Sequence, residues 1–352
     1  TWREPTLLEA GYLSLNSRPK ASRLIRAVAD HKVEPELFHN LMLAAECLND
    51  VGSTLGNDEL ANELRNRLKA ELEKPLPEVP KGMVSNLLGQ AKPVQEKRLV
   101  MLLRRMAASS TLSRIESGNF GVVSQFWTLP NGEPQWVTIP AGEFWMGEDK
   151  EIHRVHLPEY QIARVPVTNI QYQLFVLATN AKVPEHWEDG QPPKDKLNHP
   201  VVNVTWREAI AYCEWLSKVT GKKITLPSEA EWEKAARGDK DKRIYPWGDD
   251  FDSTRCNTSE SKIGGTSPVD LFPMGASPYG LLDMNGNVWE WCLSKYKSYP
   301  YKDNDGRNVI DKSNDSRVLR GGAFFNEEVL ARCAFRNRSY PYFRDGDYGF
   351  RL

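Results

Sequence analysis

The most informative segment of this sequence is residues 317–352, which read RVLRGGAFFNEEVLARCAFRNRSYPYFRDGDYGFRL. It opens with Arg320-Gly321-Gly322 and closes with Gly349-Phe350-Arg351, so glycines that allow unusual backbone angles stand near both ends. The residues between them are rich in Phe, Tyr, Arg, Asn and Asp. Rigid aromatic rings beside adaptable polar groups are typical of binding surfaces. We therefore predict that the chain displays this segment to a ligand.

The composition around this segment is that of a globular protein without a strongly charged partner. The chain has 352 residues, of which 40% are hydrophobic and 26% charged, enough for two domains with cores of their own. With 46 basic and 47 acidic residues, the net charge of -1 does not favour nucleic acid or an anionic membrane as a partner. No apolar run approaches the roughly 20 residues that span a bilayer, and no signal-peptide pattern opens the chain, so we expect a cytoplasmic protein.

The cysteines favour free thiols over disulfides or a zinc ribbon. There are five, an odd number, widely scattered and without a C-x-x-C pair: Cys47, Cys213, Cys256, Cys292 and Cys333. We expect all of them to be reduced in a reducing compartment. Because the sequence begins with Thr1 and not with Met, we also expect it to be a fragment of a longer chain.

The sequence predicts a helical domain at residues 1–116 and a second domain at residues 117–352, because helical periodicity stops there and Gly, Pro and Trp become frequent. Apolar residues recur at helical spacing over residues 34–50, 58–73 and 94–106, and the second of these stretches is stopped by prolines. Short helices joined by turns fit an α-hairpin stack or repeat array, and they fit a plain helical bundle equally well.

The second domain begins with strands and continues with two well-marked helices. The stretch at residues 136–147 reads as a strand pair broken at Pro140, and residues 153–157 and 160–165 continue it. Capping boxes predict helices over residues 206–219 and 229–237. Beyond Gly238 little periodicity is visible over about a hundred residues. Bound metal is the simplest candidate for holding this irregular chain.

An ordered series of motifs covers residues 134–352 and resembles the formylglycine-generating enzyme (sulfatase-modifying factor) family. The motifs are Trp136–Gly147, Pro166–Asn169, His199–Thr205, Leu226–Glu233, Tyr245–Gly248, Gly286–Trp291, Arg320–Gly322 and Gly349–Arg351. The resemblance implies an α+β fold, a mostly irregular variant of the C-type lectin fold. It does not imply one function, because this scaffold carries both enzymes and binding proteins.

The catalytic cysteines of that family are absent from the matching positions. Family enzymes bind copper and activate oxygen with a cysteine pair placed after Arg-Gly-Gly, and thiolates are suitable ligands for Cu(I). Here Asn326 stands at the first position, the second has no counterpart, and Cys333 aligns with a non-catalytic cysteine. We predict a non-enzyme that binds no copper. The alternative is an oxidoreductase of this family that acts on a peptide cysteine.

The C-terminal segment also resembles the variable region of proteins diversified by diversity-generating retroelements, in which the lectin-like fold presents a hypervariable surface. This resemblance implies exposed ligand-binding positions at Phe324, Asn326, Glu328, Phe335, Asn337, Arg338, Tyr340, Tyr342, Phe343, Asp345, Asp347 and Tyr348. The alternative is that Phe324, Phe325 and Phe335 belong to the core of a relative that is not diversified. The predicted ligand is another protein.

The family resemblance further implies structural Ca²⁺. One site maps onto the side chains of Asp283 and Glu290 with the carbonyls of Gly286 and Val288, a set of hard oxygen donors that suits this ion. The alternative is that the two carboxylates cap local turns.

A second, weaker calcium site would use Asn257 with the carbonyls of Thr258 and Ile263. Ser261 stands where the family enzyme has an aspartate. A neutral hydroxyl in place of a carboxylate lowers the expected affinity.

The N-terminal helices resemble the helical tails of bacterial STAND (NACHT-type) signalling ATPases. No G-x-x-x-x-G-K-[ST] loop occurs in the sequence, so the resemblance implies a nucleotide-binding module upstream of Thr1. We therefore expect the sensor part of a defence or signalling protein. A further alternative is that the helices carry the interactions and the second domain is an inert structural module.

Overall fold

The computed structural model describes residues 18–29, 127–128 and 132–352, together with positions 44, 47, 60, 63, 64, 66–68 and 70. The chain forms two compact units. The first comprises Thr1–Ser124 with Pro192–Asn198, and the second comprises Gln125–Gln191 with His199–Leu352. The predicted boundary between residues 116 and 117 lies outside the described residues.

Helix is the only regular structure described in residues 1–124. Helix α2 (Arg18–Ala29) buries Ala21 and Ile25 four residues apart, on one face. Leu64 and Leu68, from the predicted stripe of the second helix, are helical and buried. The remaining residues of the helices predicted over 34–50, 58–73 and 94–106 lie mostly outside the described residues. No described helix is long and apolar enough to cross a bilayer.

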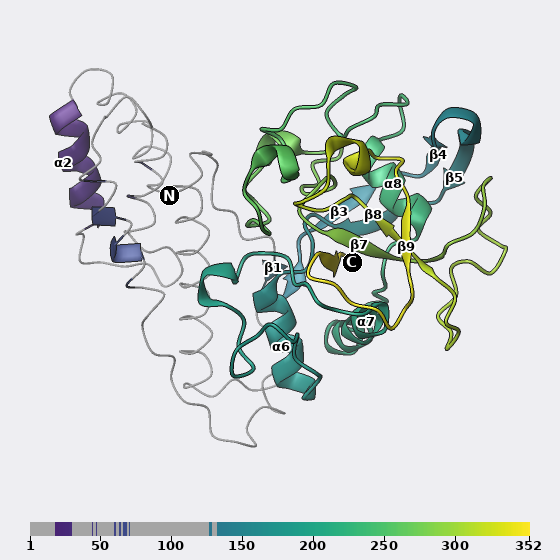
Figure 1. The fold of residues 1–352 in the computed structure, drawn as a ribbon, viewed down its shortest axis with the longest axis horizontal. Helices are drawn as coiled ribbons and strands as arrows, with labels where there is room; N and C mark the ends of the chain where they lie inside the picture. Colours follow the sequence, from purple (N-terminus) through teal and green to yellow (C-terminus); the bar gives the residue numbers. More distant parts are fainter. Residues whose placement is uncertain are drawn as a thin grey trace. The chain divides into compact units, whose positions relative to one another are not determined.

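The second unit combines short strands with three helices (Figure 1). Its strands are β1 (Trp127–Thr128), β2 (Glu133–Pro134), β3 (Trp136–Ile139), β4 (Gly142–Met146), β5 (His153–Leu157), β6 (Tyr160–Ala163), β7 (Trp289–Lys295), β8 (Arg317–Arg320), β9 (Asn337–Ser339) and β10 (Tyr348–Phe350). Its helices are α6 (Asn169–Thr179), α7 (Trp206–Thr220) and α8 (Glu229–Arg237). Single 3-10 turns are η3 (Asp149–Glu151), η4 (Lys194–Lys196, which clusters with the first unit), η5 (Ser259–Ser261), η6 (Pro273–Gly275) and η7 (Glu328–Ala331).

The central sheet has the strand order β10-β7-β8-β9 and is built largely from the C-terminal segment. Strand β10 runs parallel to β7, with Tyr348 opposite Trp289 and Phe350 opposite Trp291. The pairs β7-β8 and β8-β9 are antiparallel. In Figure 1 these strands lie in the middle of the unit, with α7 below them and α8 above. The sheet therefore ties both ends of the segment to one scaffold.

The strands over residues 136–147 are present, but they do not pair with each other as predicted. Strand β3 pairs with β6, whereas β4 pairs with β5 in a separate antiparallel ribbon. Only Pro140 and Ala141 separate β3 from β4, and a two-residue hairpin needs a positive φ at its first loop position, which proline cannot adopt. Each strand therefore finds its partner farther along the chain.

Both predicted capping boxes are confirmed. Thr205 and Ser228 cap α7 and α8, and their side chains accept from the backbone N–H of the third helical residue, Glu208 and Glu231 respectively. Helix α7 ends at Gly221, where φ is 70°. Helix α6 was not predicted, because it is buried along most of its length and lacks an amphipathic stripe.

Buried polar side chains, and not a long backbone ladder, hold the irregular chain after Gly238. The indole N–H of Trp206 donates to the Cys292 carbonyl, and that of Trp291 donates to the Val204 carbonyl, each at 3.0 Å. The Asn287 side-chain amide donates to the Ser267 carbonyl at 3.1 Å. Each such bond gives a buried backbone carbonyl a side-chain donor.

Candidate ligand-binding surface

The binding segment, residues 317–352, is anchored at its start by the Arg-Gly-Gly turn. Gly321 and Gly322 adopt φ values of 98° and 75°, which side-chain-bearing residues rarely adopt. A Cβ on Gly322 would lie 3.0 Å from the carbonyl oxygen of Leu330. The turn therefore requires glycine both for its backbone angles and for the close approach of η7.

Arg320 is the first buried anchor of the segment. Its guanidinium is fully buried, pairs with Glu233, and donates to the carbonyls of Cys333 at 2.7 Å and Ala334 at 2.9 Å. Burial alone would lower the pKa of Arg320, but the carboxylates of Glu233 and Glu229 raise it above its usual value. The charged side chain thus fixes the returning chain at residues 333–335 against α8.

Arg351 is the second buried anchor. Its Nε and Nη2 donate to the two carboxylate oxygens of Glu290, each at 2.6 Å, in a two-pronged pair. The same guanidinium donates to the carbonyls of Leu282 at 2.9 Å and Ala163 at 3.2 Å. One side chain thereby joins β10 to β6, to β7 and to the loop before β7.

Between the anchors, three rings form a surface that we call the aromatic surface: Tyr340, Tyr342 and Phe343. Their exposed fractions are 53%, 54% and 45%. Tyr340 and Tyr342 stack at 5.5 Å with an interplanar angle of 6°, whereas Pro341 between them is buried. The chain at Pro341 accepts a hydrogen bond from the Arg207 amide at 3.4 Å, so the backbone beneath the exposed rings is fixed to α7.

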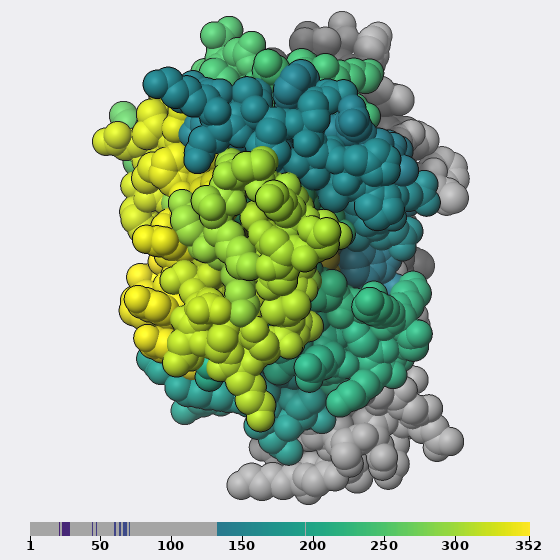
Figure 2. Space-filling model, turned by 90° about the vertical axis from the view of Figure 1, so that its right-hand side faces the viewer, coloured from purple at the N-terminus to yellow at the C-terminus, as the bar shows by residue number. Residues whose placement is uncertain are grey.

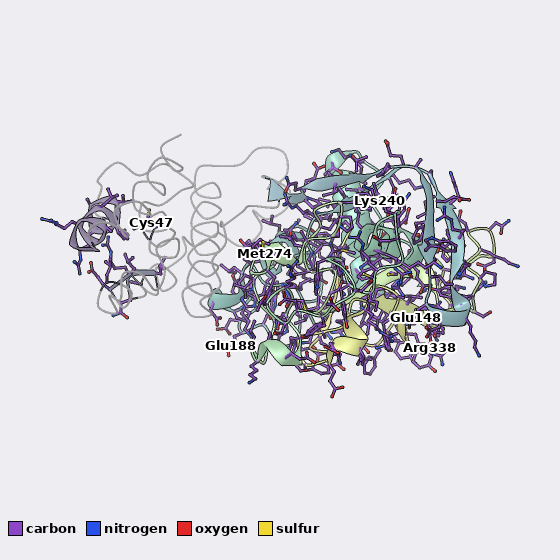
Figure 3. The ribbon with its side chains drawn as sticks, turned by 90° about the horizontal axis from the view of Figure 1, so that it is seen from above. Cys47, Glu148, Glu188, Lys240, Met274 and Arg338 are labelled. Carbon is purple, nitrogen blue, oxygen red and sulfur yellow. The ribbon has the colours of Figure 1, made fainter. Side chains whose placement is uncertain are left out.

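Arg338 and Asp345 are the other predicted binding residues that are exposed. Arg338 lies on β9, with its guanidinium 4.7 Å from the Tyr296 ring, and it is labelled at the edge of the unit in Figure 3. Figure 2 shows that the chain from about residue 296 onward, in yellow-green and yellow, covers much of one face. Five predicted positions are therefore exposed: the three rings, one arginine and one aspartate.

Six predicted positions are half-buried, and the structure shows what partly covers some of them. Phe335 packs 6.0 Å from Trp289, and Tyr348 packs 5.4 Å from Trp291. The side-chain oxygen of Asn326 accepts a hydrogen bond from the backbone N–H of Ala323 at 2.9 Å. The full half-buried set is Phe324, Asn326, Glu328, Phe335, Asn337 and Tyr348. These residues can offer an edge of a side chain to a ligand.

Asp347 corrects the sequence prediction, because it is only 3% exposed. It immediately precedes β10, where its backbone carbonyl accepts a hydrogen bond from the Trp289 amide at 2.8 Å. Pairing with β7 at this point draws the side chain inward. Burial, with a contribution from Asp345, raises the pKa of Asp347 to about 7.

The cysteine after Arg-Gly-Gly is not available for chemistry at the surface. Cys333 is fully buried, and burial raises the pKa of its thiol to about 12. All five cysteines are buried, and Cys213, Cys256, Cys292 and Cys333 form no disulfide. An inert, protonated thiol is the expected state of such a residue.

The carboxylates predicted to bind calcium have different environments. Glu290 is neutralised by Arg351 and also accepts from the Trp232 indole N–H at 2.7 Å. Asp283 is buried, pairs with no cation among the described residues, and accepts from the Asn287 side chain at 2.8 Å. Burial raises the pKa of Asp283 to about 8. A cation would suit Asp283, whereas Glu290 already has one.

The other predicted calcium ligands lie in the same region. Gly286 and Val288 flank Asn287, whose N–H donates to the Asn257 carbonyl at 2.7 Å, so the two predicted sites are adjacent. At the weaker site the Ser261 hydroxyl donates to the Thr258 carbonyl at 2.7 Å and reaches the Asn257 side-chain oxygen at 3.1 Å. That hydroxyl proton therefore satisfies oxygens that calcium would otherwise bind. In the described part of the chain, no group of three or more His, Cys, Asp or Glu is arranged to hold a metal.

Sequence reasoning missed two arginines of the segment that organise the surface. Arg336 pairs with buried Glu229 and packs 4.0 Å from the Tyr299 ring. Arg344 pairs with Glu208 at 3.0 Å, beside the aromatic surface. An arginine next to aromatics in the sequence indicates a contact residue, and only the partners distant in sequence reveal its structural role.

The comparison with known families agrees with this geometry. Residues 124–352 match the sulfatase-modifying factor enzyme 1-like domain. The chain belongs to this family. The predicted α+β, C-type lectin-like fold is therefore confirmed for this domain, which we now call the lectin-like domain. The match begins at residue 124, so the resemblance of residues 1–116 to STAND proteins stays a prediction.

The relatives include both active and inactive proteins. The formylglycine-generating enzyme of Thermomonospora curvata is 32% identical over 299 residues, covering 63% of this chain and 96% of the relative. The inactive C-alpha-formylglycine-generating enzyme 2 of Bos taurus is 30% identical over 288 residues, covering 63% and 89%. Membership of the family therefore leaves the activity open.

A solved structure shares the fold. Treponema denticola variable protein 1 aligns with a TM-score of 0.52 and 24% identity, over 66% of this chain and 98% of that protein. This likeness supports the fold of the lectin-like domain, and at this identity it shows the fold alone.

Proposed function

We propose that the lectin-like domain is a non-catalytic module that binds a protein ligand through the aromatic surface. The observation that carries the proposal is the contrast within one segment: three large rings are about half exposed, whereas Arg320 and Arg351, which frame them, are fully buried. A rigid frame that presents exposed aromatics has the features of a preorganised binding site.

The state of the thiols supports a non-catalytic role. A copper site of the kind that the family resemblance implies needs two accessible thiolates. The segment after Arg-Gly-Gly contributes one cysteine, Cys333, which is buried and whose thiol is held protonated by a pKa of about 12. At the other position Asn326 uses its side chain to hold the turn at Ala323.

The finer parts of the proposal concern how the ligand is chosen and where the protein acts. We propose that the exposed positions are diversified by a retroelement, because the framing motifs hold the fold together and the rings between them do not. Four buried cysteines without a disulfide, Cys213, Cys256, Cys292 and Cys333, support a reducing compartment such as the cytoplasm. We propose that the chain acts as the sensor part of a bacterial defence or signalling protein. The first of these parts predicts a near-copy of the codons for residues 317–352 beside a reverse transcriptase gene.

The binding proposal is tested by panning a random peptide phage library on the purified chain and measuring the enriched peptides by biolayer interferometry. We expect Y340A/Y342A/F343A to weaken their binding at least tenfold, since clustered aromatics dominate protein interfaces. The matched control is M274A/V309A/I310A, which removes three exposed apolar side chains (68%, 41% and 55%) elsewhere and should leave binding unchanged.

Two results would contradict the proposal. One is equal binding of the enriched peptides to wild type and Y340A/Y342A/F343A. The other is a loss of more than about 2 kcal/mol of unfolding free energy in that variant, because surface substitutions usually change stability by about 0.5 kcal/mol or less. The second result would place the rings in the core.

The second candidate function is an oxidoreductase acting on a peptide cysteine, which the active relatives favour. It predicts stoichiometric Cu(I) binding that is lost in C333S. Titration with Cu(I), together with a count of reactive thiols in the native chain, separates the two functions. Our proposal expects neither copper binding nor a reactive thiol before unfolding.

A further inference from the structure

An open hollow of about 510 Å³ lies on the lectin-like domain, outside the binding segment. The turn that follows Tyr245 forms it, and its principal lining side chains are Trp247, Asp249, Asp250, Phe251, Asp252 and Arg255. Its aromatic wall includes Trp247 from the Tyr245–Gly248 motif, whereas its carboxylates lie outside the family motifs, and the proposed function uses neither. We call it the aromatic hollow.

Trp247 lines this hollow, and stacking leaves at most one face of its ring open. Its other face stacks on the buried Tyr245 ring at 5.6 Å with an interplanar angle of 9°. Its indole N–H is satisfied by the Asp250 carbonyl at 3.0 Å. Phe251 packs on the same Tyr245 ring at 5.4 Å, so the wall is braced from behind. What Trp247 offers to a ligand is therefore its electron-rich face and not a hydrogen-bond donor.

The charges around the hollow do not balance. Asp252 is neutralised by Arg255 at 2.9 Å, and hydrogen bonds from Thr254 and Arg255 lower its pKa. Asp249 accepts from the Ile244 amide at 3.2 Å and lies near enough to Arg243 to help raise its pKa, but Arg243 forms its ion pair with Asp241 and Asp249 forms none among the described residues. The Asp250 carboxylate makes no hydrogen bond or ion pair within that part of the chain. Two exposed negative charges therefore stand beside the face of Trp247.

We propose that the aromatic hollow binds a cationic side chain, arginine or lysine, presented by a partner polypeptide. The face of an indole ring attracts a cation, most strongly where water is excluded, and the two carboxylates add Coulomb attraction. Arginine fits best, because its planar guanidinium can stack on the ring while it donates to carboxylates. An aromatic wall supplies no oxygen ligand, so an organic cation fits better than a metal ion.

Residues next to the hollow in the sequence, Ile244 and Tyr245, contact the binding segment. The Tyr245 hydroxyl donates to the Glu328 carbonyl at 3.5 Å, and the Cys333 amide donates to the Ile244 carbonyl at 2.8 Å. Exposed Phe325 and Val329 lie in that part of the segment. A single basic and apolar partner segment can thus occupy the hollow and reach the binding segment. This joint use rests on the proposed function, whereas cation binding by the hollow does not.

The test measures fluorescence anisotropy of a labelled hexa-arginine peptide with the full chain at low and moderate salt. A hexa-citrulline peptide of the same shape is the neutral control. We expect hexa-arginine to bind wild type, hexa-citrulline not to bind, and D249N/D250N to weaken binding at least tenfold. The amide that replaces the Asp249 carboxylate keeps an oxygen that can accept from the Ile244 N–H, so this variant should fold.

Matched variants locate the effect. E159Q/E214Q removes two exposed carboxylates outside the hollow and should change binding less than twofold. W247L should weaken binding at moderate salt as well, where Coulomb attraction is screened and stacking is not. Y340A/Y342A/F343A should bind hexa-arginine as wild type does.

Three results would overturn the inference. Equal binding of hexa-arginine to wild type and D249N/D250N would remove the hollow from the interaction. Loss of binding in Y340A/Y342A/F343A but not in D249N/D250N would move the cation to the aromatic surface. Stoichiometric displacement of the peptide by Ca²⁺ would make the hollow a metal site. None of these results bears on the phage-selected peptides, so the failure of either proposal can be told from failure of the other.

Discussion

The two buried arginines of the binding segment and its aromatic surface reverse the usual rule that charged residues are exposed and aromatic residues are buried. The arginines are Arg320 and Arg351, and the aromatic surface between them is Tyr340, Tyr342 and Phe343. The two arginines are fully buried, whereas the three rings are 45% to 54% exposed. Each arginine satisfies a carboxylate and several carbonyls at once, which makes its burial possible. The difference shows that buried charged side chains hold the backbone of this segment in place, whereas its aromatic side chains are left exposed for contact.

The largest expected effect comes from removing a buried arginine. R351M leaves the Glu290 carboxylate without its cation and the carbonyls of Leu282 and Ala163 without a donor. We expect a loss of about 3–5 kcal/mol of unfolding free energy, measured by urea denaturation of the full chain. R338M, at an exposed arginine of the same segment, is the control and should change stability by less than about 0.5 kcal/mol. Similar small losses of unfolding free energy in both variants would show that the buried arginine contributes no more to stability than an exposed one.

A smaller effect separates the two carboxylates of the predicted calcium site. Asp283 lacks the guanidinium partner that Glu290 has, so we propose that Ca²⁺ stabilises the frame mainly through Asp283. Calcium at about a hundred times its Kd should stabilise the fold by about 2.7 kcal/mol, seen as a higher Tm that EDTA reverses. D283N should abolish the response and E159Q should not. An identical Tm of the wild type in calcium and in EDTA would refute this site.

The smallest effect concerns two aspartates two residues apart, one buried and one exposed. The folded-state pKa of Asp347 is about 7, above the value of about 4 expected when unfolded. The folded chain then holds a proton that the unfolded chain releases, so stability falls as pH rises from about 4 to about 7. We expect about 2 kcal/mol of pH-dependent stability between pH 5 and 7 to vanish in D347N, measured by urea denaturation in EDTA. D345N should retain it, and a slope that D347N retains as well would contradict the assignment.

The sequence predicts those parts of the fold that depend on interactions between residues close together in the chain. Thr205 with Glu208 and Ser228 with Glu231 mark two helix starts, and the structure confirms both. Helix α6 was not predicted because it is buried on nearly all sides, so its apolar residues show no helical periodicity that would distinguish it from a strand. The pairing of β3 and β4 escaped for another reason, because the partner of a strand depends on contacts far along the chain.

The candidate site divides in the same way. Exposure of Tyr340, Tyr342 and Phe343 was predictable, since Pro341, Arg344 and Asp345 break up any apolar face. Burial of Asp347 was not, because it follows from the pairing of β10 with β7. The aromatic hollow left a signal in the sequence, a Trp and a Phe alternating with aspartates at residues 247–252, but its meaning depends on the stacking of Trp247 on Tyr245.

The hydrogen bonds of Arg351 bear on how the domain folds. The guanidinium contacts the Ala163 carbonyl across 188 residues of sequence and Glu290 across 61. Contacts of this range close long loops, and folding slows as their share increases. We therefore expect the contacts of Arg351 to form after the more local helices and ribbons. Before they form, the carboxylate of Glu290 would lack its cation and the edges of β7 would be open, and we expect this stage of folding to be the one most prone to aggregation.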